Sequence, residues 1–164
     1  MNEPIKHYFN RVEEEVDRMR LLVGMHAMEY GCLVAFLREL GRPEDVSHGT
    51  YASVGFQYGQ LNGLIVQYHL QEQESFVAAE PVLSWFLDRG WKQGTQNENA
   101  SWGYREVEFK KVEPEPAMFW PPHKEWKPYE LRATVRIWPH PNSQVCKKVE
   151  DGTEPKYKFV CVGS

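Results

Sequence analysis

Residues 4–40 read PIKHYFNRVEEEVDRMRLLVGMHAMEYGCLVAFLREL, and this uninterrupted stretch decides the fold class. Pro4 suits the first turn of a helix, where its missing N–H costs nothing. Gly41 followed by Pro43 is a stop signal. The sequence therefore predicts a continuous or gently kinked helix over residues 4–40. A break into two helices at Gly24 or Gly31 is the alternative.

Apolar residues recur along this helix in alternating steps of four and three. The series gives a 3.5-residue period, which is the seam pattern of a coiled coil. Charged residues flank the first half of the series, whereas the second half is apolar nearly all round and so is expected to be buried on more than one side. The members of the series are Ile5, Phe9, Val12, Val16, Met19, Val23, His26, Tyr30, Leu33, Leu37 and Leu40.

The first half of the series predicts a homo-oligomer interface. Because helical hairpins and intramolecular bundles produce the same stripe, packing within one chain is the competing interpretation. The predicted interface residues are Ile5, Phe9, Val12, Val16, Met19 and Val23.

The rest of the chain shows strand patterns and one further helix. Pro81 lies inside the apolar pattern of residues 75–89, so this helix is expected to begin only near Glu80. Residues 92–101 are polar and rich in turn formers, which indicates a loop or hairpin tip. Five of the 11 prolines fall within residues 113–128, which indicates a long stiff loop. Strands are expected over residues 51–58, 64–70, 104–112, 129–138, 145–149 and 156–162.

These elements define an α+β fold, with a long N-terminal helix, a mainly antiparallel sheet of about five to six strands, and one further helix. The chain has 164 residues, of which 41% are apolar and 26% charged, a size and composition typical of one compact globular unit. Within that unit, residues 1–42 are expected to form a helical arm and residues 43–164 the α+β domain.

Charge and composition narrow the classes of function and location. The net charge of −4 disfavours nucleic acid as a binding partner, because the negative phosphates bind basic protein surfaces. The sequence has no run of about 18 apolar residues, so no membrane span is expected. The polar N-terminus lacks the apolar segment of an export signal, which favours the cytoplasm. Cys146 and Cys161 are placed to face each other across a hairpin, and they are expected to be plain buried thiols.

Motifs that carry chemistry are missing from the sequence. It contains no phosphate-binding glycine loop, no nucleophile elbow and no paired Cys or His at zinc-ligand spacing, so no cofactor and no metal are expected. Two-histidine phosphoesterases use a pair of His-x-Thr/Ser motifs, and this sequence contains only one such triplet, His48-Gly49-Thr50. The alternative function is nevertheless a small hydrolase or nucleotide-processing enzyme that uses His48 or His69 with Arg132 and Arg136.

All six tryptophans lie after residue 84, and they suggest a binding surface. In residues 129–138, apolar side chains alternate with Arg132, Thr134, Arg136 and Trp138, so an Arg/Trp face is expected to point away from the core. Trp and Arg are enriched at protein–protein hot spots. A competing interpretation is that the helix or the proline-rich loop covers this face and the arginines pair with glutamates. The predicted binding residues are Trp102, Trp120, Trp126, Arg132, Arg136 and Trp138.

The leading functional expectation is a non-catalytic binding and assembly protein. It self-associates through the N-terminal helix and contacts a protein partner of unknown identity through the Trp/Pro/Arg surface. Besides the enzyme alternative above, a single-stranded nucleic-acid binder that uses aromatic stacking is a further alternative, which the acidic charge disfavours.

Overall fold

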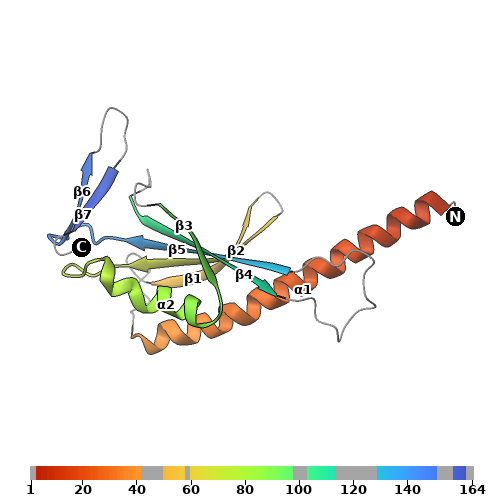
Figure 1. Ribbon diagram of the computed structural model, residues 1–164, viewed down its shortest axis with the longest axis horizontal. Coiled ribbons are helices and arrows are strands. Elements are labelled where there is room, and N and C mark those ends of the chain that lie inside the picture. The colour runs from red at the N-terminus through yellow and green to blue at the C-terminus, as the bar shows by residue number, and fades with distance from the viewer. Residues whose placement is uncertain are drawn as a thin grey trace.

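The computed structural model describes residues 3–41, 50–57, 60–97, 103–113, 129–150 and 157–161. Within them the predicted α+β class is confirmed (Figure 1). The helices are α1 (Glu3–Glu39), the short 3-10 helix η1 (Phe76–Ala79) and α2 (Glu80–Asp88). The strands are β1 (Tyr51–Gln57), β2 (Gln60–His69), β3 (Lys92–Asn97), β4 (Arg105–Glu113), β5 (Tyr129–Trp138), β6 (Cys146–Glu150) and β7 (Tyr157–Cys161).

Five strands form the main sheet in the order β1-β2-β5-β4-β3. β1 and β2 form the expected hairpin, but β2 begins at Gln60, earlier than the strand expected over residues 64–70. β4 pairs antiparallel with both β3 and β5. The central pair is different, because β2 and β5 run parallel, with Val66 opposite Val135. The sheet is therefore mainly antiparallel, and two strands far apart in sequence meet at its centre.

The hydrophobic core lies between one face of the sheet and the helices α1 and α2, which cover that face (Figure 1). The alternation predicted for residues 129–138 is confirmed, since the Leu131, Ala133, Val135 and Ile137 side chains are all buried. Phe86 of α2 stacks on Phe109 of β4, with ring centroids 4.7 Å apart. The Tyr68 hydroxyl reaches the end of η1 and donates to the Ala78 carbonyl oxygen at 2.8 Å.

α1 is a single helix of 37 residues, so the continuous form is confirmed. A Cβ built at Gly24 or Gly31 would meet no atom within 4 Å, which shows that neither glycine is needed for close packing. The C-terminal half of α1 packs on the sheet, whereas its N-terminal half projects beyond the sheet (Figure 1). The predicted arm boundary at residues 42 and 43 lies outside the described residues and stays a prediction.

Two further expectations fall on the middle of the chain. The start of the second helix near Glu80 is confirmed, with Pro81 in the first turn of α2. The loop predicted for residues 92–101 is wrong over Lys92–Asn97, which is the edge strand β3. Every residue of β3 is exposed, so the strand carries no apolar alternation that could have revealed it.

β6 and β7 form a separate antiparallel hairpin, and its cysteines correct another expectation. Cys146 lies directly opposite Cys161, with Cα atoms 4.0 Å apart, and the two are bonded as a disulfide rather than being free thiols. Strand register brings the two sulfur atoms together, which sequence spacing alone does not specify. Disulfides persist mainly in oxidising compartments and are rare in the cytoplasm, where thiols are kept reduced. The cytoplasmic location expected above stays a prediction.

Candidate functional site

An exposed apolar stripe follows the projecting half of α1. Five of the six predicted interface side chains are between 41% and 52% exposed, and the sixth, Val23, is half-buried. None of the six belongs to the hydrophobic core. Counting from the N-terminus, Leu22 and Met25 are the first residues of α1 that contact the core. We call Ile5, Phe9, Val12, Val16, Met19 and Val23 the α1 stripe. Among the described residues, the core therefore leaves the stripe uncovered.

The docked half of α1 buries a histidine. His26 is 2% exposed, and its two ring nitrogens meet groups of opposite kind. Nδ1 lies 2.9 Å from the Leu22 carbonyl oxygen, and Nε2 accepts from the backbone N–H of Arg132 at 3.3 Å. Burial lowers the pKa of His26 below 6.5, outweighing its two backbone hydrogen bonds and the charge of Glu29. His26 therefore joins α1 to β5 as a neutral side chain.

Glu29 makes a second polar contact between the docked half and the rest of the fold. Its carboxylate accepts from Arg89 Nε at 3.0 Å and from Lys111 Nζ at 3.3 Å. Burial alone would raise the pKa of Glu29, but the Arg89 hydrogen bond and the Lys111 charge outweigh it, so the pKa is lowered. The carboxylate stays ionised and ties α1 to the end of α2 and to β4.

Sequence reasoning placed His26 in the apolar series and overlooked Glu29. A signal was present, because Glu29 is the only acidic residue in the mostly apolar stretch 21–38. A lone acid in a buried helix is expected to have a cationic partner. The sequence does not say that this partner is Arg89 and Lys111, which lie 60 and 82 residues away.

The stripe and the docked face point in different directions around α1. With about 100° of rotation per residue, the α1 stripe is centred about 90° from the line through Leu22, His26, Glu29 and Leu33. The direction of the stripe is that of Tyr30 and Val34 further along the helix. Along the docked half this direction faces β1, and Tyr30 packs against the core, so a partner helix can follow the stripe only over the projecting half of α1.

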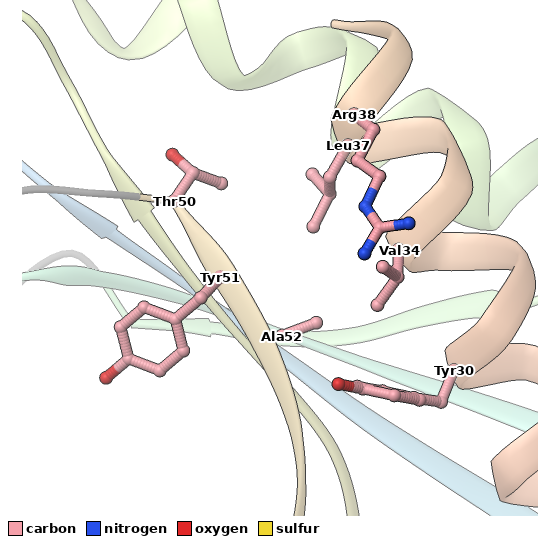
Figure 2. A pocket seen from close by; sticks show the side chains of 7 residues that line it. All are labelled: Tyr30, Val34, Leu37, Arg38, Thr50, Tyr51 and Ala52. Atoms are coloured by element: carbon pink, nitrogen blue, oxygen red, sulfur yellow. The ribbon is translucent and has the colours of Figure 1, made fainter. Parts of the chain in front are cut away.

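Tyr30 and Val34 line a groove between α1 and β1 (Figure 2). Its volume is about 560 Å³, and Leu37, Arg38, Thr50 and Ala52 also line it. In Figure 2 the Arg38 guanidinium extends from the helix toward the strand, while the Tyr51 ring points away. The groove continues the direction of the α1 stripe, and its lining holds no acid–base pair.

On the face of the sheet opposite α1, two of the predicted binding residues come together. Arg136 Nε donates to Glu106 Oε2 at 3.0 Å, and Trp138 Nε1 donates to Gln67 Oε1 at 2.5 Å. The Trp138 ring lies 4.6 Å from the Tyr104 ring and 6.0 Å from the His69 ring. We call Gln67, His69, Tyr104, Glu106, Arg136 and Trp138 the open-face cluster.

Polar and aromatic groups within this cluster stabilise one another. The Arg136 guanidinium also lies over the Tyr104 ring, 5.2 Å from its centroid. Burial raises the pKa of Tyr104 above its ordinary value, so its hydroxyl stays protonated further into the alkaline range. The cluster is a preorganised aromatic surface rather than a set of unpaired charges.

The other predicted binding residues are not part of this cluster. Arg132 shares the face but pairs with Glu130 at 2.9 Å, in a largely exposed ion pair. Both arginines thus pair with glutamates, as the competing interpretation expected. Trp102, Trp120 and Trp126 lie outside the described residues.

The structure describes some of the residues proposed for the alternative enzymatic function, but not all of them. His48 lies outside the described residues. His69 stacks beside Trp138, and Arg136 is occupied by Glu106. In the described part of the chain, no group of three or more His, Cys, Asp or Glu is placed to hold a metal ion.

Comparison with other proteins adds no identification. No family model matches the chain, and comparison with curated proteins and with solved structures finds no relative. By length and composition alone, the stretch Ile5–Glu39 of α1 is long and apolar enough to cross a membrane, a test that core helices and signal sequences also pass. The expectation of no membrane span stays a prediction.

Proposed function

We propose that this protein is a non-catalytic assembly protein that self-associates through the α1 stripe. The observation that carries the proposal is the exposure of this apolar series on a helix that projects beyond its own sheet. Fully burying an exposed apolar side chain of this size stabilises by about 1.5–3 kcal/mol. Five of the stripe side chains are 41% to 52% exposed, so covering each gains about half of that, and together they favour association.

The period of the stripe supports a helical partner. A repeat of 3.5 residues keeps the apolar positions facing a second helix over several turns, whereas a random exposed patch lacks this spacing. Charged residues on both flanks, among them Glu13, Glu15 and Arg20, are typical of a coiled-coil seam bordered by water.

Sedimentation equilibrium of the full chain across the micromolar range tests self-association. We expect the wild type to sediment as an oligomer and Val16→Asp to shift it to monomer. Met28→Asp is the matched control, because Met28 is 76% exposed and lies on a different side of α1. A wild type that stays monomeric throughout the range contradicts the proposal, as does equal loss in both variants.

We further propose that a protein partner contacts the open-face cluster, together with Arg132, Trp102, Trp120 and Trp126. The supporting observation is the grouping of Trp138, Tyr104 and Arg136, since Trp, Tyr and Arg dominate binding hot spots. Affinity capture that compares wild type with Trp138→Ala tests this surface, and Val77→Ala is the control for an exposed apolar residue elsewhere. A partner that Trp138→Ala retains at wild-type level contradicts the proposal.

A further inference from the structure

We propose that the partner of the α1 stripe is a second copy of this chain, paired with it parallel and in register. The inference rests on the self-association proposed above and adds the orientation. It follows from the charges that flank the stripe and from the direction in which the stripe faces.

The step pattern assigns each residue a heptad position. Steps of four and three in turn place Phe9, Val16 and Val23 at position a, and Ile5, Val12 and Met19 at position d. The positions that border the seam follow from this assignment. Position e holds Lys6, Glu13 and Arg20, and position g holds Tyr8, Glu15 and Leu22.

A parallel pair in register matches these border charges. In that arrangement, a g residue faces the e residue of the next heptad on the other helix. Glu15 then faces the partner's Arg20, and by symmetry this ion pair forms twice. Within one chain, the Arg20 side chain is 78% exposed and contacts Asp17 at 3.4 Å, so it is accessible to a partner.

An antiparallel pair that overlaps along the whole stripe does not match them. There e faces e and g faces g, because the helices run in opposite directions. Lys6 would face the partner's Arg20, and Glu13 and Glu15 would each face their own copies. These are contacts between like charges, which destabilise a helix pair.

Among the described residues, none of the core side chains covers the stripe along Ile5–Val23, where the second helix would lie. This stretch projects beyond the sheet, and the stripe lies about 90° around α1 from the line through Leu22, His26, Glu29 and Leu33. Pairing therefore leaves the contacts of His26 and Glu29 with their own chain intact. The groove at Tyr30 and Val34 lies on the same side of α1 as the partner helix.

Charge reversal tests the orientation by sedimentation of the full chain. Arg20→Glu places two glutamates opposite each other in a parallel pair, and we expect dimer affinity to fall about three- to tenfold. The double variant Glu15→Arg/Arg20→Glu restores the ion pair and should recover most of the loss. Glu14→Arg, an outward position, is the control and should leave affinity unchanged. If Arg20→Glu strengthens the dimer, the parallel arrangement is overturned, because the new carboxylate would then face Lys6 of an antiparallel copy.

Cysteine cross-linking gives an independent readout of register. In a Cys32→Ser background, Val12→Cys places equivalent d positions side by side in a parallel pair, so mild oxidation should give a covalent dimer. In the antiparallel pair Val12 faces the partner's Val16. Cross-linking only in a mixture of Val12→Cys and Val16→Cys chains would overturn the proposal.

The outcomes separate this inference from the proposed function. A monomeric wild type overturns both. A wild-type dimer that Val16→Asp dissociates, but that fails the charge-reversal and cross-linking tests, keeps the proposed function and rejects the parallel orientation.

Discussion

The two halves of α1 share one apolar repeat but distribute polar and apolar groups in opposite ways. The docked half buries His26 and Glu29, whereas the projecting half exposes Ile5, Phe9 and Val12. In the docked half, each of these two buried polar side chains has a partner on the sheet or at the end of α2, which offsets its loss of water. In the projecting half, apolar groups meet no such partner within the described core.

This contrast shows that the period of a helix and its environment are separate properties. The 3.5-residue repeat runs through both halves, so it indicates a helix that packs on something. What it packs on differs along its length. The docked half is specified by polar contacts within one chain, and we infer that the projecting half is specified by a surface that becomes complete only in an assembly.

The largest expected effect separates the halves by stability. Leu33 is fully buried, so Leu33→Ala should lower the free energy of unfolding by about 2–5 kcal/mol through lost burial and a cavity. Val12→Ala, measured at a concentration where the chain is monomeric, should change it by less than about 0.5 kcal/mol. Urea denaturation followed by circular dichroism measures both. Equal losses would show that the projecting half packs within its own chain.

A smaller effect is expected at the polar contacts of the docked half. Glu29→Gln removes the charge that faces Arg89 and Lys111, and should cost about 1–2 kcal/mol at neutral pH. Because the pKa of Glu29 is lowered on folding, its contribution is present above about pH 4.5 and lost as pH falls through the folded pKa. Glu14→Gln on the projecting half is the control and should leave the unfolding free energy unchanged. A control loss equal to that of Glu29→Gln would contradict a specific role for Glu29.

His26 is expected to make the unfolding free energy of the protein depend on pH. Its folded pKa lies below 6.5, so the unfolded state binds more protons between the two pKa values, and the unfolding free energy falls as pH drops below 6.5. Protonation removes the acceptor of the Arg132 N–H, a hydrogen bond worth about 1 kcal/mol. We expect His26→Gln to flatten this dependence of the unfolding free energy on pH. Denaturation curves measured between pH 7 and pH 5 check this, and an unchanged slope in His26→Gln would refute it.

The smallest effect is expected where the two halves meet. Gly24 lies inside the helix, and an added Cβ meets no atom within 4 Å. Gly24→Ala should therefore raise the unfolding free energy by about 0.5–1 kcal/mol, through helix propensity alone. Thermal denaturation of the monomer measures the gain. A loss instead would show that this position needs the freedom of glycine.

The sequence predicts this fold best where the pattern is local. The long helix, the start of α2 at Glu80 and the alternation of β5 all follow from spacing and proline positions. Strand β3 could not be found, because each of its residues is exposed and nothing alternates. The parallel pairing of β2 with β5 could not be found either, since it depends on register between distant segments.

The candidate site divides in the same way. The α1 stripe was predicted residue by residue, because helical spacing fixes which side chains share a side. On the open face, Arg136 and Trp138 were predicted from the alternation of one strand. Gln67 comes from β2, Glu106 from β4 and Tyr104 from the residue before β4, so only the assembled sheet could bring them to Trp138.

The central β2–β5 pair also has a consequence for how the chain is made. Leu64 and Ala133 are neighbours in space but are synthesised far apart. Until β5 leaves the ribosome, the β1–β2 hairpin lacks its inner neighbour, and two-stranded hairpins are marginal on their own. Nascent chains that stop before residue 129 should therefore stay open to proteolysis. Chains extended through Trp138 should acquire protection together in one late step.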